Sequence, residues 1–441
     1  MTFQKSLLTL ALGLACANVN AAGFQLHETS VSGLGRAFAG DAVIADDASV
    51  FARNPAAMAL FDKKSLSVGA TYVDPGVDVK GTGAPDLVLM NPNFDVSSLD
   101  QNGVVPAALI PSAYFINPVD EKFAWGVGLN VNYGLASKYD SDYAAGSIAG
   151  ETDLFSLNIN LGGSYRINEQ LSVGAGINLV YADAMLNRNT GAILVNGLPS
   201  VLPAMPADTT LMHIEGDDTG FGWNVGVVYE LNENHRFGLT YRSAVEITFE
   251  GELTDLVGNK SNGSLAMDMP AFAEFSGFHQ LTNDWAVHYS VMHTDWDSFE
   301  ELSAFVDGSD VPAFYKVENF ESTLRTALGV TYNFDEKLTL RAGIAFDESA
   351  AQQGNRSVSI PDSDRLWYSA GATYVLDASS TIDFGLAYVN GEKVEVVEHD
   401  AILETAIRAN PAVAPLLGNT NWSFESEGNA ILVGFQYNRQ F

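Results

Sequence analysis

The chain has 441 residues, of which 22 are Lys or Arg and 54 are Asp or Glu, so its formal net charge at pH 7 is −32. A surface this acidic repels phosphate, and no basic run appears in the chain, which excludes nucleic acid as a partner. Hydrophobic residues make up 47% of the chain and are evenly spread, which argues against intrinsic disorder. Charged and apolar residues must therefore be segregated in space, as they are in β-strands that alternate between lipid and water.

The first 21 residues have the composition of a secretory signal peptide. Lys5 gives a charged start, residues 7–17 form a short apolar stretch, and Val19-Asn20-Ala21 is similar to a cleavage site. Cleavage after Ala21 is expected to remove Cys16, the single cysteine, so the mature chain needs no disulfide. No run of about 18 apolar residues remains for a transmembrane helix, so a membrane location would require a barrel.

Residues 22–63 differ in pattern from everything that follows them. Short helices and loops are predicted near residues 33–37 and 46–49, and the segment closes with Asn54-Pro55-Ala56, where Asn before Pro is typical of a turn. We therefore predict a signal peptide at 1–21, a compact N-terminal hatch at 22–63 and a transmembrane β-barrel at 64–441. If the strands close into a barrel, the natural place for the hatch is the lumen.

The remainder of the chain predicts strands separated by turns. Fourteen stretches are expected to be strands: 65–79, 105–117, 122–134, 152–167, 170–187, 213–231, 234–249, 270–281, 284–297, 320–334, 337–348, 363–376, 380–391 and 423–441. Short turns are expected near 117–121, 167–170, 232–234, 282–284, 334–336 and 377–379, and every other connection is longer. This parity is typical of outer-membrane barrels, which have short periplasmic turns, long outer loops and an even strand number. The predicted fold is therefore all-β: a 14-stranded antiparallel transmembrane β-barrel plugged by a small, mainly helical N-terminal hatch.

Single strands show the alternation that a lipid-facing wall requires. Within residues 338–346 the even positions are apolar, whereas Thr339, Arg341 and Gly343 face the other way. The terminal Phe441 follows an alternating aromatic strand and resembles the signal read by the bacterial barrel-assembly machinery. We expect the protein in the outer membrane of a Gram-negative bacterium, surrounded by its lipid and lipopolysaccharide.

Two groups of motifs, far apart in the chain, carry a resemblance to a known family. The first group is Ala22-Gly23-Phe24-Gln25-Leu26, Ser32-Gly33-Leu34-Gly35-Arg36-Ala37, Ala45-Asp46-Asp47-Ala48 and Arg53-Asn54-Pro55-Ala56. The second group is Ile344-Ala345-Phe346-Asp347-Glu348-Ser349 with the stretch 355–365. Together they resemble the long-chain fatty acid outer-membrane transporter family (FadL-like), and the resemblance covers essentially the whole mature chain.

The resemblance implies a plugged barrel with a low-affinity site in the extracellular loops and a high-affinity apolar pocket inside. It also implies that substrate leaves sideways, through a gap made by a kink in the third strand, where this chain has Gly126, Gly128 and Gly134. The hatch residues expected near the inner pocket are Phe24, Leu26, Asn54, Pro55 and Ala56.

Two predicted loops, 189–210 and 253–269, are too apolar to be fully solvated. They are predicted either to form a groove that catches a hydrophobic molecule or to pack on each other and cap the barrel. The residues expected to line such a groove are Leu198, Val201, Leu202, Met205, Leu265 and Met267.

Extrapolating the strand alternation places several charged side chains in the lumen, namely Arg242, His288, Arg325, Arg341, Arg365 and Asp383. Most lumen arginines pair with acids on neighbouring strands or on the hatch, but one left over would suit a ligand carboxylate. The candidates are Arg188, Arg325, Arg341 and Arg365. Where the family resemblance leads us to expect carboxylate-binding basic residues, this chain has Asp183 and Glu321, with Arg188 and Arg325 close by.

No motif predicts catalysis, a metal site or a cofactor, because the histidines are scattered and Gly-x-Ser-x-Gly is absent. The first hypothesis is passive uptake of long-chain fatty acids by a monomer, with no energy-coupling motif. The alternatives are a channel for aromatic or alkane hydrocarbons and, from a different class, a general porin or a phage or adhesion receptor.

Overall fold

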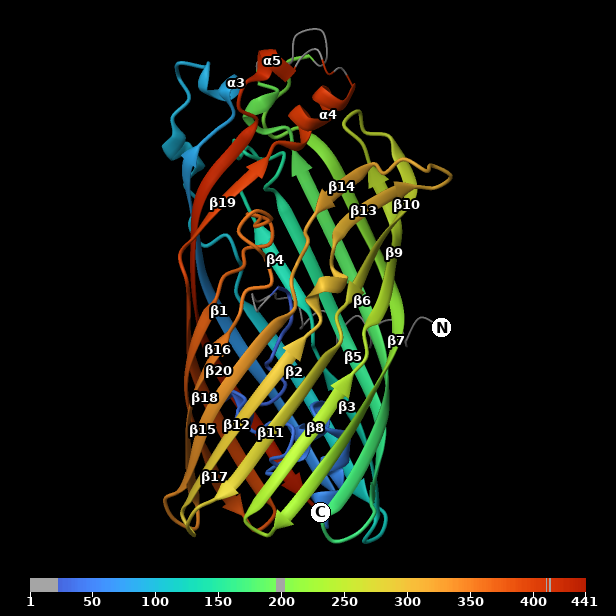
Figure 1. The fold of residues 1–441 in the computed structure, drawn as a ribbon, viewed down its shortest axis with the longest axis vertical. Coiled ribbons are helices and arrows are strands. Elements are labelled where there is room, and N and C mark those ends of the chain that lie inside the picture. Colours follow the sequence, from blue (N-terminus) through green and yellow to red (C-terminus); the bar gives the residue numbers. More distant parts are fainter. Residues whose placement is uncertain (1–22, 196–202, 410, 412–413) are drawn as a thin grey trace.

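The protein is a tall β-barrel with a small N-terminal segment inside its lower part (Figure 1). The computed structural model describes residues 23–195, 203–409, 411 and 414–441. The predicted signal peptide and three of the predicted groove residues, Leu198, Val201 and Leu202, lie outside the described residues.

The barrel wall is built from twenty strands that form one sheet. The strands are β1 (Ser65–Gly83), β2 (Ala108–Pro118), β3 (Phe123–Asn130), β4 (Gly134–Lys138), β5 (Glu151–Arg166), β6 (Leu171–Asn189), β7 (Thr210–Asn232), β8 (His235–Arg242), β9 (Val245–Thr254), β10 (Lys260–Met269), β11 (Phe272–Gln280), β12 (Trp285–Thr294), β13 (Glu301–Val306), β14 (Phe314–Val317), β15 (Thr323–Asn333), β16 (Leu338–Asp347), β17 (Arg365–Asp377), β18 (Ser380–Gly391), β19 (Val394–His399) and β20 (Asn421–Gln440). The helices are α2 (Val31–Leu34), η1 (Ala48–Ala52), η2 (Pro55–Leu60), α3 (Asp86–Leu89), η3 (Val96–Leu99), η4 (Gly191–Ile193), η5 (Trp296–Ser298), α4 (Ala401–Ala409) and α5 (Ala414–Leu417).

These strands make fourteen spans of the wall, because six spans are each divided into two consecutive strands. The divided spans are β3/β4, β8/β9, β10/β11, β12/β13, β14/β15 and β18/β19. The barrel closes where β1 pairs antiparallel with both β2 and β20. The predicted 14-stranded antiparallel barrel is therefore confirmed, and the six short turns lie where the alternation of connection lengths predicted them. We call the end with the short turns, where the C-terminus lies in Figure 1, the lower end.

The outward face of the wall changes character partway up. In the lower part of β7, Phe221 and Trp223 point outward and are exposed, whereas Glu215 and Asp217 take the outward positions in its upper part. The inward face changes in the opposite sense, because the buried residues of β9 in the upper part include Ile247 and Phe249. A barrel crossing a membrane needs apolar residues outside only where it meets lipid, so the change marks where the wall emerges into water.

This change explains the main error of the sequence analysis. Residues 253–269 were predicted to be a loop, but they form the end of β9, a tight connection and the whole of β10. In this hairpin polar residues such as Glu252 and Ser264 face water and Leu265 and Met267 face inward, which is the reverse of the lipid-facing pattern. Lipid-facing alternation therefore predicted an end at residue 249 for a span that continues to Thr254, and it did not predict β10, β13, β14 or β19.

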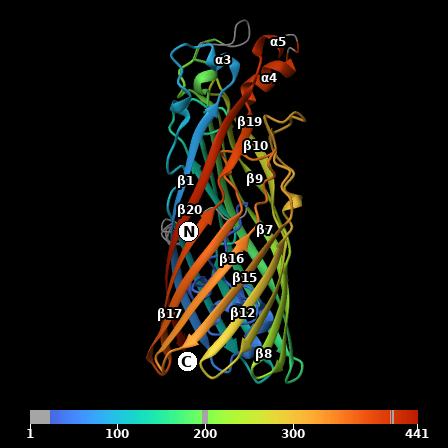
Figure 2. The same ribbon diagram turned by 60° about the vertical axis from the view of Figure 1, so that its left-hand side comes forward.

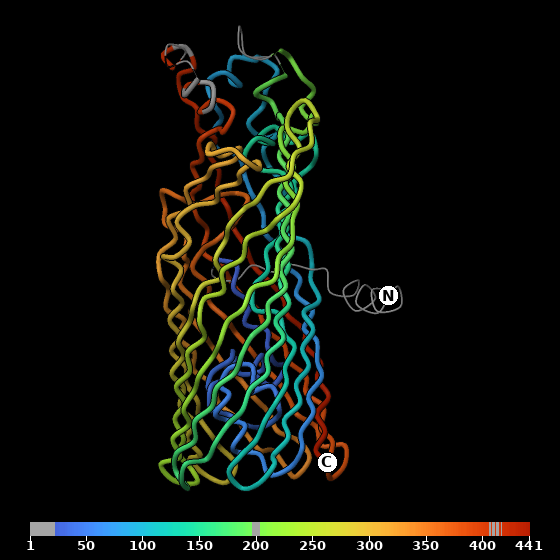
Figure 3. Tube along the Cα trace, turned by 90° about the vertical axis from the view of Figure 1, so that its right-hand side faces the viewer, coloured from blue at the N-terminus to red at the C-terminus, as the bar shows by residue number. Residues whose placement is uncertain are grey.

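The N-terminal segment lies inside the lower part of the barrel (Figures 2 and 3). Polar side chains cap the N-termini of its short helices. Ser30 Oγ accepts a hydrogen bond from Gly33 N at 3.0 Å, and Asn54 Oδ1 accepts one from Ala56 N at 2.9 Å. Glycines in the wall give the segment room, since a Cβ at Gly226 would lie 1.9 Å from Asn54 Oδ1 and one at Gly174 would lie 2.4 Å from the backbone of Pro55. We call the described residues 23–61 the hatch.

Charged side chains fill the remaining lumen around the hatch. Arg36 Nη2 lies 3.1 Å from Asp41 Oδ1, and Asp46 Oδ2 lies 3.0 Å from Arg341 Nη2 of β16. Asn54 Nδ2 also donates to Val227 O of β7 at 3.2 Å. The hatch is therefore held to the wall by ion pairs and hydrogen bonds and also by two buried apolar clusters, one that contains Phe38 and Trp367 and one that contains Phe51 and Tyr114.

The upper end is closed by packed loops. The short helices α3, η3 and α4 and residues of β1, β19 and β20 contribute to one buried apolar cluster, in which Trp422 and Leu403 are among the most buried members. Ile193 and Leu194 are buried in this cluster and Met205 packs against it. The described part of the 189–210 loop thus follows the capping alternative. No helix among the described residues is long and apolar enough to cross a membrane.

Candidate ligand-binding site

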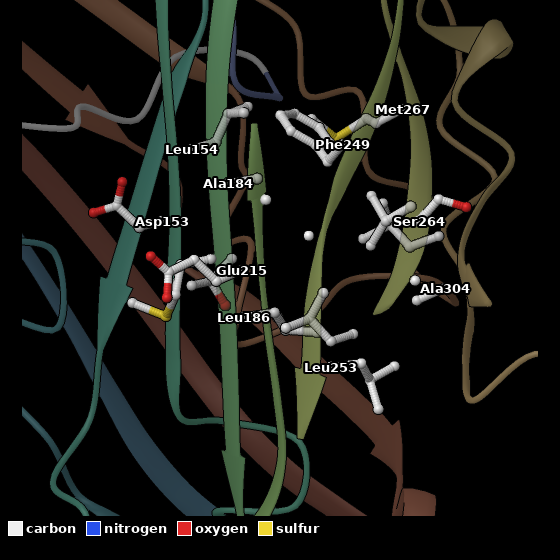
Figure 4. Close-up of a pocket in the computed structure, with 18 of the residues that line it drawn as sticks. Asp153, Leu154, Ala184, Leu186, Glu215, Phe249, Leu253, Ser264, Met267 and Ala304 are labelled. Atoms are coloured by element: carbon white, nitrogen blue, oxygen red, sulfur yellow. The ribbon is translucent and has the colours of Figure 1, made fainter. Parts of the chain in front are cut away.

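An apolar cavity of about 60 Å³ lies in the upper part of the barrel, against the start of the hatch. Inward side chains of β5, β6, β9, β10 and β13 line it together with Phe24 of the hatch. In Figure 4, Phe249, Leu253 and Met267 lie on one side and Leu154, Ala184 and Leu186 on the other. Such a lining suits an apolar chain, because most of the described lining residues are apolar and none is basic, although Asp153, Glu215 and Glu252 also border the cavity.

Three residues selected from the sequence meet in this apolar cavity: Phe24, Leu265 and Met267. Phe24 is 1% exposed and packs edge-on against Trp296 and Phe299, with ring centroids 4.6 and 5.3 Å away. The sequence analysis missed Phe249, Phe299, Leu302 and Ile360, which also line it. The reversed alternation of β9, with Val245, Ile247 and Phe249 at every second position, was the signal that could have found them.

A second cavity, of about 220 Å³, lies beside the first and has a polar lining. Arg188, Lys316 and Arg356 contribute basic groups, Glu398 and Glu404 contribute acidic groups, and the remaining lining residues are Ser147, Ile148, Phe314, Tyr315, Val317, Gly354, Asn355, Val397, His399 and Ala401. We call it the headgroup cavity. Lys316 and Arg356 were not selected from the sequence, because β14 was read as part of a loop and Arg356 as part of a family motif.

Residues that line the two cavities are neighbours on the strands. Leu186 lines the apolar cavity, and Arg188, two residues further along β6, lines the headgroup cavity. Ala304 of β13, in the apolar cavity, lies directly opposite Phe314 of β14, in the headgroup cavity. A molecule with a polar end and an apolar chain therefore has neighbouring places for both parts.

The basic groups of the headgroup cavity differ in their partners. The guanidinium of Arg188 donates to neutral oxygens only: Thr152 Oγ1 at 3.2 Å, Asn187 O at 2.9 Å and Glu151 O at 3.3 Å. Lys316 Nζ instead lies 3.0 Å from Glu398 Oε1 and 3.3 Å from Glu318 Oε1, and it also donates to Ser357 and Ser359. Arg188 is thus a buried cation that forms no ion pair with a described carboxylate, which is what a ligand anion requires.

The other three candidate arginines lie on wall strands and already have partners on the hatch or on the wall. Arg341 pairs with Asp46 of the hatch at 3.0 Å and with Asp383 at 3.7 Å, and Arg365 pairs with Asp362 at 2.8 Å. Arg325 donates to Ala37 O of the hatch at 3.1 Å, and its guanidinium lies 5.3 Å from the Trp367 ring centroid. None of the three lines either cavity.

The remaining hatch candidates contact the wall. Asn54, Pro55 and Ala56 pack against β6 and β7, and Leu26 is buried beside the third span. Asp183 lies on the outward face of β6, directly opposite Asp217, and Glu321 is exposed after β14. Neither acid lines the headgroup cavity, where Arg188 and Lys316 lie instead.

The third span is interrupted between Asn130 and Gly134. The hatch fills the interruption, because Leu26 N donates to Asn132 O at 2.7 Å and Gly134 N donates to Phe24 O at 2.9 Å. Among the described pairings, β3 pairs with both β2 and β5, whereas β4 pairs with β5 alone. Phe24 therefore touches both the apolar cavity and the interrupted wall.

Of the glycines expected at a kink, Gly134 borders the interruption, whereas Gly126 and Gly128 lie before it in β3. Both lie in the regular part of β3, where a Cβ would meet Met58 Sδ at 2.6 Å or the Tyr114 ring at 2.9 Å. They make room for the hatch and for the neighbouring strand.

A closed barrel with a filled lower lumen and two neighbouring cavities above it defines the class: a membrane-spanning transport barrel for a hydrophobic molecule. The chain belongs to the family described as "Outer membrane protein transport protein (OMPP1/FadL/TodX)", whose model matches residues 12–441. The protein is thus an outer-membrane transport barrel of the kind found in Gram-negative bacteria.

Named relatives agree over the full length. The chain is 40% identical to a long-chain fatty acid transport protein of Escherichia coli O6:H1 and 41% identical to outer membrane protein P1 of Haemophilus influenzae, in both cases over 100% of this chain and 99% of the relative. A Pseudomonas aeruginosa FadL homologue has the same fold, with a TM-score of 0.80 at 20% identity over 95% of this chain and 100% of that one. The Pseudomonas putida toluene transporter TodX gives a TM-score of 0.67 at 16% identity over 96% of this chain and 100% of that one.

Proposed function

We propose that the protein takes up long-chain fatty acids passively across the outer membrane. The observation that carries the proposal is the pair of neighbouring cavities, one lined in part by Arg188 and Lys316 and the other mainly by apolar side chains. The carboxylate binds in the headgroup cavity and part of the acyl chain lies in the apolar cavity, where its transfer from water drives binding. The names of the full-length relatives support this substrate.

The proposed exit is the interrupted third span. Phe24 and Leu26 form hydrogen bonds with the wall there, and Phe24 also lines the apolar cavity. Displacing the start of the hatch would therefore release the acyl chain and unblock the unpaired edge of β4 in one movement. The proposal requires neither catalysis nor a cofactor. Consumption of the fatty acid inside the cell makes net transport run inward.

Uptake of labelled oleate by cells that lack the gene, with and without the gene restored, tests the proposal. Restoration should return uptake, and the purified protein should bind oleate. Unchanged uptake in the deletion strain together with no oleate binding would reject fatty acid transport.

A second candidate is transport of aromatic or alkane hydrocarbons, which the apolar cavity alone would serve because it needs no carboxylate partner. Competition separates the two: excess toluene should displace little oleate if the fatty acid is the substrate, whereas strong displacement favours the hydrocarbon. A general porin would instead show large ohmic steps in a planar bilayer, whereas a barrel filled by its hatch should be nearly silent.

We also propose that the protein acts as a monomer, that residues 1–21 are removed on export, and that the barrel-assembly machinery inserts the barrel through its Phe441 end. Outer-membrane lipid and lipopolysaccharide then surround the wall.

A further inference from the structure

Glu318, which directly follows β14, is a buried acid beside the headgroup cavity. Its side chain is 0% exposed, and neither carboxylate oxygen accepts a hydrogen bond from the described residues. Its nearest cation is Lys316, whose Nζ lies 3.3 Å from Oε1. Leaving an ionised carboxylate in this state is costly, because burial removes its hydration and the ion pair with Lys316 compensates only in part.

The balance of charges around the cavity makes the protonation state of this acid important for the binding of an anionic ligand. Two cations, Arg188 and Lys316, face two acids, Glu318 and Glu398, so the centre of the cavity is neutral when both acids are ionised. Tyr139, Arg356, His399 and Glu404 surround this group. A ligand carboxylate would leave an uncompensated negative charge in a buried site unless one acid became neutral.

We propose that Glu318 sets the headgroup specificity of the cavity: an anionic headgroup binds together with one proton, which Glu318 takes up, whereas an uncharged headgroup binds without a proton. The proton comes from solvent and adds to a Glu318 carboxylate oxygen, so the charge of the cavity is the same before and after the anion enters. This inference rests on the proposed function, because it assumes that the headgroup lies beside Arg188 and Lys316.

Burial raises the pKa of Glu318 to about 7, against the opposing effect of Lys316, so the acid changes charge within the ordinary pH range. A bound anion raises that pKa further. Anion affinity is therefore fully present below about pH 7 and falls as the pH rises above it, by up to about tenfold per pH unit for one linked proton. The affinity for an uncharged headgroup has no such dependence.

The test uses the purified full-length protein with two probes of equal chain length: tetradecyl sulfonate, which stays ionised throughout, and tetradecanol. Dissociation constants are measured between about pH 6 and 9 for the wild type, for Glu318→Gln and for the control Glu395→Gln, which changes an outward-facing exposed acid on β19. In the wild type, sulfonate binding should weaken up to about 100-fold from pH 7 to 9, while tetradecanol binding should not change. The Glu395→Gln variant should behave as the wild type does.

Glu318→Gln should bind the sulfonate equally well across the range, because its amide is always neutral, and at pH 9 it should bind more tightly than the wild type. Calorimetry of the wild type at pH 8 in two buffers of different ionisation heat should show uptake of about one proton per sulfonate and none per alcohol, which tests the inference even if the variant fails to fold.

A wild-type sulfonate affinity that is constant from pH 6 to 9, or a Glu318→Gln variant that keeps the wild-type slope, would overturn the inference while leaving the proposed function intact. Binding of neither probe at any pH would overturn both.

Discussion

The outward and inward faces of the barrel differ between its lower and upper parts. In the lower part the wall is apolar outside, and the lumen holds polar partners such as the Asp46–Arg341 ion pair. In the upper part the outside is polar, and the lumen contains Phe249, Leu265 and Met267 around an apolar cavity. The ligand site is therefore expected in the upper part, where an apolar cavity is present, whereas the lower lumen is occupied by the hatch, which contacts the wall through both polar and apolar side chains.

The two parts meet at Phe24. This residue begins the described hatch, lines the apolar cavity and binds the interrupted third span through its carbonyl oxygen. A movement at the start of the hatch would therefore change the lining of the apolar cavity.

Deleting residues 22–62 is expected to have the largest effect. The strands and the Phe441 end lie outside this segment and their hydrogen bonds close without it, so the barrel should still assemble. Oleate uptake should be lost while ion conductance appears, because the obstruction and part of the cavity wall leave together. Heat-resistant migration, bilayer conductance and uptake are measured on one preparation. A folded variant that conducts no ions and takes up oleate at the normal rate would contradict the claim that this segment blocks the lumen.

Cross-linking the hatch to the wall should abolish transport and spare binding. Gln25 and Tyr133 form an isolated antiparallel bridge, a spacing that suits a disulfide, and the predicted mature chain has no other cysteine. In Gln25→Cys/Tyr133→Cys, oleate uptake should stop under oxidising conditions and return on reduction, with each single substitution as control. Equal uptake in both redox states would rule out exit through the interrupted span.

A smaller change in the upper part should weaken ligand binding without touching the hatch. Met267→Ala removes buried apolar surface from the cavity, and its cost of about 1–2 kcal/mol corresponds to a roughly tenfold weaker affinity for fatty acid and fatty alcohol alike. The control Leu328→Ala removes an exposed, outward-facing side chain of β15 and should leave both affinities unchanged. Equal effects of the two substitutions would show that the ligand does not bind in the apolar cavity.

The smallest effect on ligand affinity is expected for Arg325→Met in the lower part. The substitution removes the hydrogen bond to Ala37 O and a positive neighbour of Asp347, which should destabilise the hatch by about 1–3 kcal/mol and raise ion leakage. Affinities for acid and alcohol should stay equal to those of the wild type, and this is checked by conductance and by binding of both ligands. A selective loss of fatty acid binding would move the headgroup site into the lower lumen.

Much of this architecture could be predicted from the sequence, because lipid imposes one strict pattern on the lower wall. The positions of Arg325, Arg341 and Arg365 inside the barrel followed from that alternation, and so did the six short turns. Upper strands such as β10 and β13 escaped prediction, since a wall in water can place polar residues outside and resembles an ordinary loop.

For the same reason, only part of the candidate site could be predicted from the sequence. Leu265 and Met267 stood out by their apolarity, but nothing in the sequence separates Arg188, whose hydrogen bonds go to neutral oxygens, from Arg341, which has two acidic partners. That difference depends on contacts between segments up to hundreds of residues apart. Lys316 was missed because its strand was missed.

The central claim, that the ligand carboxylate binds in the upper part beside Arg188, is tested most directly by comparing tetradecanoate and tetradecanol in Arg188→Met. Loss of a charge-assisted hydrogen bond of about 1.5–3 kcal/mol should weaken tetradecanoate binding roughly 10- to 100-fold and leave tetradecanol binding within about twofold of the wild type. Equal weakening of both ligands, or no change in either, would contradict the claim.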